Sequence, residues 1–397
     1  MSKNYNIFFD LGSTTIRVAA FGKNSNDKQI SFEKKCNSCF KKEDLNINNL
    51  NNNLEFLVLD LEKKMNEYVE SANILIDSID SLNLSISISK KGDNKKLTRN
   101  DVKILVNNAK QEINKHNEDL KILHILITNF KIDGKNFSTI QLEKEYKLLS
   151  LDILFICFPK NILEKVNSIF KKNHISVQNF ISSSYAKSFN YKDKFTSLEN
   201  IIFVELGYDK TSIITYKNQY LKTFSQIPIG GNHITKDISK VLKISYEESE
   251  SIKRNFNNKD LFSENSDIQE KLLRNLNENK LNHEEFSLMI KEIIFARINE
   301  ILSMSTKIVR DILIDEEDEK YKIILIGSGS RILESNSITV IKNLNLLDEF
   351  DYFTETSKII CKSGENLLLN GNPQEVVIVP KQSEISGFFV RFFNLFK

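Results

Sequence analysis

The chain has 397 residues, of which 40% are hydrophobic, and a formal net charge of +2. This length exceeds what one hydrophobic core usually supports, so we expect two or more domains with enough apolar residues to fill them. The balance of 55 Lys and Arg against 53 Asp and Glu leaves no basic field of the kind that drives nucleic-acid binding. Four cysteines are too few for a disulfide framework in a chain this long.

The first residues, MSKNYNIFFDLG, lead directly into an expected strand, so no secretory signal is predicted. No window of about 18 apolar residues predicts a membrane-spanning helix. The expected location of the bulk of the chain is therefore the cytoplasm. Cys36 and Cys39 form a single CxxC, and a zinc site would need a second pair of ligands. Two free thiols in a loop are the favoured interpretation.

The first half of the chain is expected to alternate strands and helices. Residues 5–23 follow a strand–turn–strand pattern, and Lys23 to Asn53 form a polar stretch. Thr98 precedes Asp101 by three residues, which predicts a capping box where a helix begins. Further helices are predicted over 54–71 and 160–172 from their apolar spacing. Further strands are predicted at 74–76, 84–88, 122–128, 152–158 and 175–181.

The second half, from about residue 199, repeats the opening pattern of strand, Gly-containing turn and strand. Its predicted strands lie at 201–206, 212–216, 222–228 and 322–326, with a hairpin near Asn218 and Gln219. A helix is predicted from Gly231 to near Leu242, and residues 246–315 are predicted to be mostly helical. This internal repetition predicts two α/β halves of similar architecture.

The first Gly-containing turn is Asp10–Thr15 (DLGSTT), between two apolar strands. Gly12 permits a tight hairpin whose backbone N–H groups can point at an anion. The hydroxyls of Ser13, Thr14 and Thr15 can donate to phosphate oxygens. Asp10 is placed to hold hydrated Mg²⁺, which prefers oxygen ligands. An ordinary hairpin is the alternative for this motif taken alone.

The second turn, Glu205–Thr211 (ELGYDKT), supplies a second acid and a second candidate phosphate-binding hairpin. The third turn, Gly327-Ser328-Gly329-Ser330, follows a buried strand, and its glycines would let a flat ring approach the backbone. It lacks the third glycine of a dinucleotide fingerprint, and the absence of GxxxxGK[ST] excludes the P-loop class. The alternatives are a β-hairpin with an acidic corner and a plain strand-to-helix turn.

In this order and spacing, the three turns resemble the phosphate-1, phosphate-2 and adenosine motifs of the actin, Hsp70 and sugar-kinase superfamily. Ile227–Ile238 (IPIGGNHITKDI) and Glu247–Lys253 (EESESIK) are similar to segments of the bacterial cell-division family FtsA. Ser182–Ala186 (SSSYA) lies where FtsA has a linker helix, and 84–158 where FtsA carries its inserted subdomain. The resemblance covers nearly the whole chain and is strongest at 7–20, 201–255, 322–330 and 385–397.

The resemblance implies an α/β, actin-like ATPase fold: two similar α/β domains around a nucleotide cleft, with an FtsA-type inserted subdomain in place of an actin subdomain. The first domain is expected at 1–83 and 159–190, with the inserted subdomain at 84–158 between them. The second domain is expected at 191–235 and 317–371, with a helical nucleotide-side subdomain at 236–316. A tether at 372–384 and a membrane helix at 385–397 complete the expected division.

The resemblance also implies ATP and Mg²⁺ as cofactors. Asp10 and Glu205 are expected to hold the ion through water. Glu205 stands where many relatives have Asp, Tyr208 and Asp209 replace glycines of the second turn, and no general base can be named. ATP binding with slow or absent hydrolysis is therefore expected, and no catalytic residue is assigned. The residues expected to bind nucleotide are Asp10, Gly12, Ser13, Thr14, Thr15, Glu205, Gly207, Tyr208, Gly230, Gly231, Asn232, Glu250, Lys253, Arg254, Gly327, Ser328, Gly329 and Ser330.

The segment 385–397 (ISGFFVRFFNLFK) separates apolar from cationic residues when placed on a helical wheel. Such a pattern is typical of a helix that lies in a membrane interface, and the segment is too short to span a bilayer. A helix docked on the core of the protein is the alternative. The residues expected to meet the membrane are Ile385, Phe388, Phe389, Arg391, Phe392, Phe393, Phe396 and Lys397.

The implied function is an adaptor that tethers filaments of the tubulin-like protein FtsZ to the cytoplasmic face of the inner membrane at the division site. The implied partners are the FtsZ C-terminal peptide, further copies of the chain in a head-to-tail filament, membrane lipids and other division proteins, but no nucleic acid. A filament would multiply weak lipid contacts by avidity. The alternatives are a PilM-like platform protein, which should lack the lipid helix, and a sugar or acid kinase, which needs a catalytic Asp.

Overall fold

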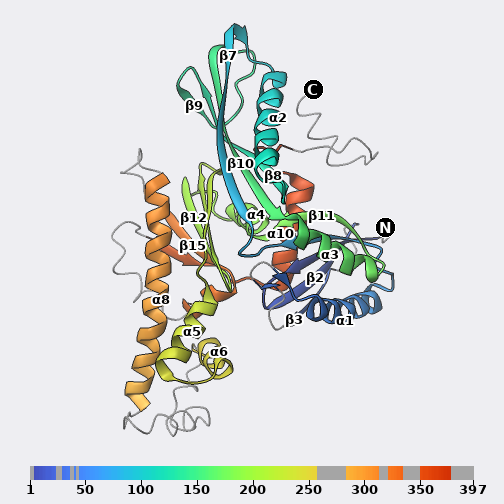
Figure 1. Ribbon diagram of the computed structural model, residues 1–397, viewed down its shortest axis with the longest axis vertical. Helices are drawn as coiled ribbons and strands as arrows, with labels where there is room; N and C mark the ends of the chain where they lie inside the picture. The colour runs from blue at the N-terminus through green and yellow to red at the C-terminus, as the bar shows by residue number, and fades with distance from the viewer. Residues whose placement is uncertain are drawn as a thin grey trace. The chain divides into compact units, whose positions relative to one another are not determined.

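The computed structural model describes residues 4–23, 29–35, 40–41, 44–256, 283–312, 321–333 and 349–376. The chain divides into two compact units (Figure 1). Unit 1 consists of Met1–Glu199, Tyr216–Phe224 and Thr356–Lys397, and unit 2 of Asn200–Thr215 and Ser225–Glu355. The predicted membrane helix at 385–397 and the pair Cys36 and Cys39 lie outside the described residues.

The first sheet of unit 1 has the order β11-β6-β1-β2-β3. Strand β1 pairs antiparallel with β2 and parallel with β6, and β6 pairs parallel with β11. These contacts confirm the predicted strand–turn–strand at 5–23. The third strand, which was not predicted, lies in the polar stretch from Lys23 to Asn53. The strands are β1 (Tyr5–Leu11), β2 (Thr15–Gly22), β3 (Ile30–Lys35), β6 (Ser71–Ile76) and β11 (Ser176–Ser182), with a short pair β4 (Phe40–Lys41) and β5 (Asp44–Leu45) beside them in sequence.

Helices cover both faces of this sheet. Helices α1 (Ile47–Met65) and α3 (Lys160–Lys172) share one apolar core with β1, β2 and β6. Helix α10 (Ser357–Asn370) contacts β1 and β2 and also α4 (Ser183–Lys192). A Cβ at Gly364 of α10 would lie 2.8 Å from Leu75, so the absence of a side chain lets this helix approach the sheet.

The predicted helix at 54–71 was wrong in both bounds, because α1 begins at Ile47 and ends at Met65. Asparagine lowers helix propensity inside a helix but is favoured as its first cap. The side chain of Asn46 accepts from the N–H of Asn49 at 3.2 Å. At the other end Asn66 takes the left-handed conformation, with φ of 56°, and stops the helix.

A second sheet of unit 1 has the order β7-β10-β8-β9 and is antiparallel throughout. Its strands are β7 (Leu82–Lys96), β10 (Glu145–Pro159), β8 (Leu120–Ile132) and β9 (Lys135–Phe137). Helix α2 (Arg99–His116) lies along one face and shares a buried core with the sheet (Figure 1). The predicted capping box of Thr98 and Asp101 is confirmed.

Unit 2 is built on the sheet β14-β13-β12-β15-β16, in which β12 and β15, and β15 and β16, pair parallel. Its strands are β12 (Asn200–Leu206), β13 (Thr211–Lys217), β14 (Tyr220–Ile227), β15 (Lys322–Ile326) and β16 (Glu349–Tyr352). Residues 216–224 of the β13–β14 hairpin are counted with unit 1. Both five-stranded sheets place their strands in the chain order third, second, first, fourth, fifth. The predicted internal repetition is therefore confirmed.

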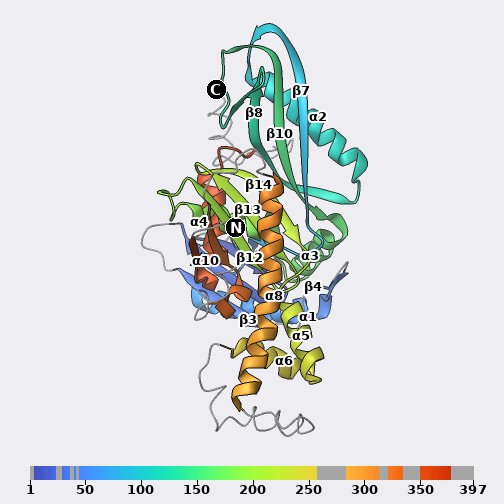
Figure 2. The ribbon, with the colours of Figure 1, turned by 90° about the vertical axis from the view of Figure 1, so that its left-hand side faces the viewer.

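Helices α5 (Gly231–Leu242), α6 (Tyr246–Arg254) and α8 (His283–Ile312) share the apolar core of unit 2 with β12 and β15. Figure 2 shows α8 running in front of the strands of this sheet. The 3-10 helix η2 (Ser328–Leu333) follows β15 directly. Across the described parts of both units, no helix has the length and apolar character needed to cross a bilayer.

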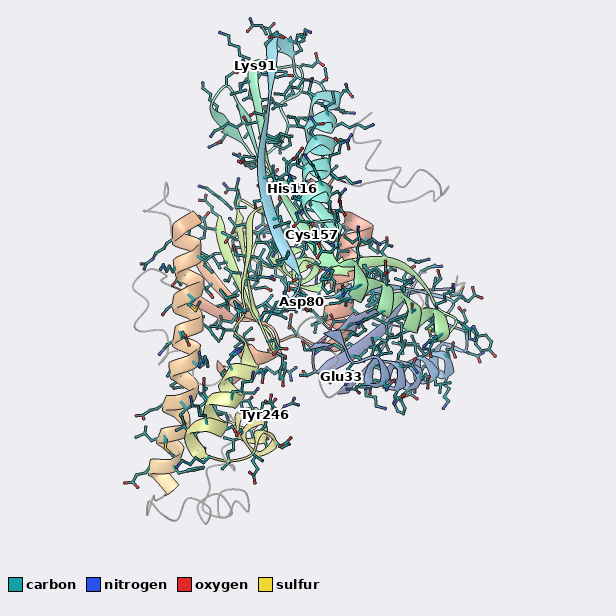
Figure 3. The ribbon with its side chains drawn as sticks, in the orientation of Figure 1. Glu33, Asp80, Lys91, His116, Cys157 and Tyr246 are labelled. Atoms are coloured by element: carbon teal, nitrogen blue, oxygen red, sulfur yellow. The ribbon has the colours of Figure 1, made fainter. Side chains whose placement is uncertain are left out.

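Cys157 and Cys361 are buried free thiols (Figure 3 labels Cys157 on β10). Burial raises the pKa of Cys157 to about 12 and raises that of Cys361 well above its ordinary value. Both thiols are therefore protonated at neutral pH and behave as small core residues.

Candidate functional site

The second predicted turn packs backbone to backbone against the start of α5. Gly231 N–H donates to the carbonyl of Gly207 at 2.9 Å, and Asn232 N–H donates to that of Tyr208 at 2.7 Å. A Cβ at Gly230 would lie 2.6 Å from the Tyr208 oxygen, which no side chain tolerates. Glycine at position 230, just before α5, therefore allows the turn and the helix to touch.

The third turn packs against the second. Gly327 has φ of +89°, and a Cβ there would lie 2.7 Å from the carbonyl oxygen of Leu206. A Cβ at Gly329 would lie 2.7 Å from Leu206 Cγ. Gly327 N–H donates to the buried Glu355 carboxylate at 3.0 Å. Unit 2 thus brings together two of the three predicted turns, and Glu355, which no motif identified, supports one of them.

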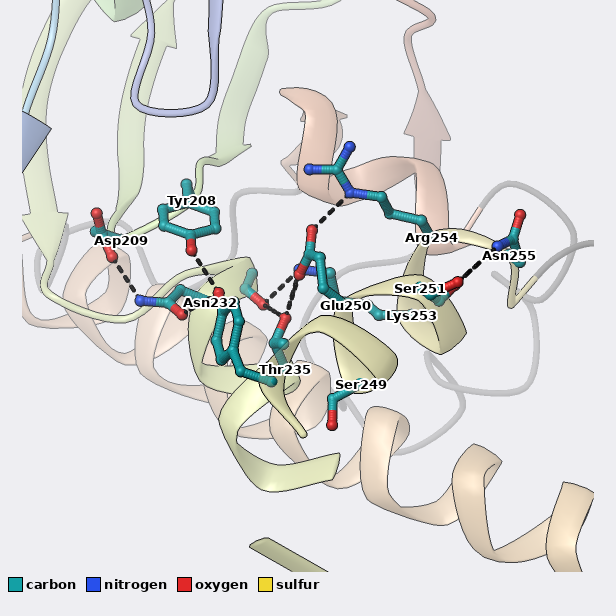
Figure 4. Close-up of polar contacts among 12 residues, drawn as sticks. Tyr208, Asp209, Asn232, Thr235, Ser249, Glu250, Ser251, Lys253, Arg254 and Asn255 are labelled. Atoms are coloured by element: carbon teal, nitrogen blue, oxygen red, sulfur yellow. Dashed lines mark hydrogen bonds and ion pairs between the residues drawn. The ribbon is translucent and has the colours of Figure 1, made fainter. Parts of the chain in front are cut away.

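A partly buried ionic cluster joins α6 to α5 (Figure 4). Glu250 accepts from Thr235 at 2.5 Å and from Arg254 at 2.7 Å, and it pairs with Lys253 at 2.6 Å. Lys253 also donates to the carbonyl of Gly231 at 3.0 Å and to Thr235 at 2.7 Å. The predicted common face of Glu250, Lys253 and Arg254 is confirmed, and the Lys253 ammonium is committed to bonds inside the protein.

Charge and burial act against each other in this cluster. Burial raises the pKa of Glu250, but the charge of Lys253 and hydrogen bonds from Lys253, Thr235 and Arg254 outweigh it and lower that pKa overall. Burial lowers the pKa of Lys253 more than Glu250 raises it. The Glu250 carboxylate is therefore ionised at neutral pH. The charged form of Lys253 is stabilised by the neighbouring Glu250, which opposes the effect of burial.

The two residues that replace glycines in the second turn are held by a hydrogen-bonded series (Figure 4). Tyr246 O–H donates to Asn232 Oδ1 at 2.8 Å, and the Tyr208 hydroxyl bonds to that of Tyr246. Asn232 Nδ2 donates in turn to Asp209 Oδ1 at 2.9 Å. Burial raises the pKa values of Tyr208 and Tyr246, so both phenols stay neutral. The series fixes this turn against α5 and α6 without any ligand.

The first predicted turn lies in unit 1. Gly12 N–H donates to the carbonyl of Thr15 at 3.1 Å, which closes the hairpin. Asp10 is 5% exposed, and its carboxylate accepts from Arg17 and from Ser183, each at 2.8 Å. Sequence reasoning missed both partners. Arg17 could have been found, because it is the cross-strand neighbour of Asp10 in the β1–β2 hairpin.

The carboxylate of Asp10 fits a hydrated Mg²⁺ better than a directly bound one. Arg17 already supplies a positive charge to one oxygen, and direct coordination would have to displace it. Each carboxylate oxygen has more than one acceptor position, so a water proton can still be accepted. In the part of the chain that the structure describes, no cluster of three His, Cys, Asp or Glu side chains could hold a metal ion.

The predicted hydroxyl donors have different surroundings. Ser13, Thr14 and Thr15 are half-buried in the first turn, and Ser328 is exposed at the third. Ser330 is fully buried and donates to the carbonyl of Gly327 at 2.6 Å, so its hydroxyl closes the turn.

Two sheets with the same strand order, each with a Gly-containing turn after its first strand, define an actin-like ATPase fold. Solved structures agree. The chain matches the PilM–PilN type IV pilus biogenesis complex with a TM-score of 0.60, covering 91% of this chain and 95% of that chain at 10% identity. It matches the ethanolamine utilization protein EutJ from Carboxydothermus hydrogenoformans with a TM-score of 0.51, covering 91% and 89% at 12% identity.

The sequence comparisons show a similarity to one protein family over part of the chain. Residues 202–358 match the family described as Cell division protein FtsA. FtsA of Buchnera aphidicola subsp. Baizongia pistaciae is 26% identical over 280 residues, which are 66% of this chain and 62% of that protein. The chain is therefore similar to FtsA proteins over part of its length. The match spans less than two thirds of the length of this relative.

Proposed function

We propose that this chain is an ATP-binding, actin-like adaptor that tethers FtsZ filaments to the cytoplasmic face of the membrane and helps to assemble the division machinery. One observation carries the proposal. The family match at 202–358 covers the same segment in which the second and third turns, α5 and α6 pack into one cluster.

The proposed ligand is ATP with Mg²⁺, and the turns of unit 2 would hold it. The Gly207 turn would face phosphate, because exposed backbone N–H groups in a tight turn attract anions. The Gly327 turn would lie against adenosine, and the cluster of Glu250 and Lys253 would position the ribose side. In the proposal, Asp10–Thr15 supplies the phosphate contacts of unit 1. The phosphate groups of ATP carry the negative charge that the backbone N–H groups of these turns attract.

Hydrolysis is proposed to be slow. Asp209 adds negative charge to the second turn, and its carboxylate is tied to Asn232 rather than placed as a base. ATP would then act mainly by favouring one conformation, which supports head-to-tail contacts between copies.

The segment 385–397 is proposed as the lipid-binding helix, from its sequence pattern alone. The decisive experiment is liposome co-sedimentation with ATP, comparing the full chain with a chain that ends at Glu384. We expect only the full chain to pellet. Equal pelleting of both, or of neither, would reject the tail as the anchor. A labelled FtsZ C-terminal peptide, added in fluorescence anisotropy, tests the partner separately.

A PilM-like platform protein is the second candidate, supported by the fold match across 91% of the chain. Such a protein would bind a peptide of a membrane protein rather than lipid. Liposome pelleting together with FtsZ-peptide binding distinguishes the two candidate functions. The adaptor pellets with lipid and binds the FtsZ peptide, whereas the platform does neither.

A further inference from the structure

The segment Asn372–Val376 is fixed to unit 1 by both backbone and side-chain bonds. Ile127 N–H donates to the carbonyl of Gln374 at 2.9 Å, and Val376 N–H donates to that of Ile125 at 2.8 Å. The Gln374 side chain, itself buried, donates to Ile127 O at 3.1 Å and to Leu221 O at 2.9 Å and accepts from Leu221 N–H at 2.7 Å. These residues open the predicted tether, yet they form a short strand-like clip on the edge of β8, which we call the β8 clip.

A buried polar cluster holds the middle of the β8 clip. Glu375 lies 2.6 Å from His124 Nδ1 and accepts from Tyr185 O–H at 3.0 Å. Asn372 donates to the Tyr185 oxygen at 2.9 Å. His124 Nε2 lies 3.0 Å from the N–H of Ser182. A backbone N–H can only donate, so Nε2 carries the lone pair and Nδ1 carries the proton that is donated to Glu375.

The same bonds continue to the first predicted turn without leaving unit 1. Ser182 and Ser183 are neighbours where β11 ends and α4 begins. Ser182 bonds His124, and Ser183 donates to Asp10 at 2.8 Å. If Ser183 moves together with Asp10, its neighbour Ser182 moves as well. The Ser182 N–H group, which donates to His124, is then displaced.

We propose that the β8 clip is coupled to the Asp10–Thr15 turn through His124 and Ser182. A ligand that binds at Asp10 would then weaken the hydrogen bonds that hold the clip on β8. The functional meaning of this coupling rests on the proposed function, because the clip precedes the segment proposed to bind lipid. Coupling is reciprocal, so a loosened clip also changes the affinity of the turn for its ligand. A double-mutant cycle measures this coupling.

The first test needs no nucleotide. Hydrogen exchange at the Val376 and Ile127 amides is measured in the unliganded full chain with Ser183→Ala, Glu375→Ala and both changes. We expect Ser183→Ala alone to speed exchange at these amides about tenfold, which corresponds to the loss of one buried hydrogen bond. In a chain that already carries Glu375→Ala, Ser183→Ala should not speed exchange further. Additive effects would overturn the proposal. Glu375→Gln keeps an acceptor oxygen and the same shape, so it provides a second variant if Glu375→Ala does not fold. Glu145→Ala, at an exposed position of β10, is the matched control.

The second test adds Mg-ATP and follows binding by calorimetry. We expect ATP to speed Val376 exchange in the unaltered chain but not in Glu375→Ala. If ATP binds and Val376 exchange does not change, the coupling is wrong and the proposed function stands. If ATP does not bind, the proposed function fails, and the mutant cycle still decides the coupling.

Discussion

Lys253, a residue predicted to bind nucleotide, also makes structural bonds within unit 2. Its side chain is 11% exposed, and its ammonium bonds to Glu250, Thr235 and the carbonyl of Gly231. It therefore locks the helix start that the second turn touches. Its effect on nucleotide binding would be indirect, through the position of Gly231.

We expect Lys253→Met to lower the free energy of unfolding by about 1–3 kcal/mol, because the partly buried Glu250 loses a charged partner. ATP binding should weaken about tenfold as Gly231 loses its bond, on the same energy scale. Denaturant unfolding and calorimetry measure the two effects. Lys240→Met, on the exposed side of α5, is the control and should change neither. Unchanged stability would contradict the structural role.

Gly327 and Gly134 offer a matched pair at the same scale. Both have positive φ, +89° and +84°, but a Cβ at Gly134 meets nothing within 4 Å. Gly134→Ala should therefore lower the free energy of unfolding by only about 1 kcal/mol, which is the cost of placing a residue with a side chain in the left-handed backbone conformation. Gly327→Ala should cost more, because its Cβ would meet the Leu206 oxygen, and it should abolish ATP binding. Equal costs in chemical denaturation would show that the turns are not in contact.

At the scale of elements, local sequence decided where several helices begin and end. Thr98 and Asp101 cap α2, and Asp101 also pairs with Lys90 of β7 at 2.5 Å. Burial would raise the pKa of Asp101, but hydrogen bonds from Lys90 and Thr98 hold it at about 2. Because the folded pKa lies below the ordinary value of 3.8, Asp101 stabilises the fold above pH 4 and stops doing so as pH falls through 2.

We expect Asp101→Asn to cost about 1 kcal/mol at neutral pH, the usual value of a helix cap. Between pH 4 and 2 the unaltered chain should lose this advantage, so the two unfolding curves should converge. Urea unfolding at several pH values checks the result, with Asp133→Asn, in the β8–β9 turn, as a control. A constant difference down to pH 2 would mean that Asp101 is not the titrating group.

At the scale of the whole molecule, the two five-stranded sheets repeat one strand order although their sequences differ. Each sheet uses a hairpin for its first strands and parallel pairing for its later ones. The β8 clip adds a feature that this repetition does not contain. It joins residues about 250 positions apart in sequence.

Two truncations test whether the β8 clip belongs to the folded domain. A chain ending at Val376 keeps every bond of the clip, and we expect its thermal unfolding to match that of the full chain. A chain ending at Gly371 leaves His124, Tyr185 and the β8 edge without these partners. Several hydrogen bonds of about 1 kcal/mol each should be lost, which lowers the midpoint by several degrees. Equal midpoints would mean that the clip is dispensable.

The sequence by itself determined the alternation of elements, the two similar halves, the three turns and the capping box of α2. These depend on local periodicity, on glycine and on side chains a few residues apart, all of which are visible in one dimension. It misplaced the start of α1, because Asn-rich composition hides a capped helix. Only the tertiary structure decided that Ser183 bonds Asp10, that Glu355 supports Gly327, and that the β8 clip forms. Such bonds join residues that are distant in sequence, and which buried polar groups meet is decided by packing rather than by any local pattern.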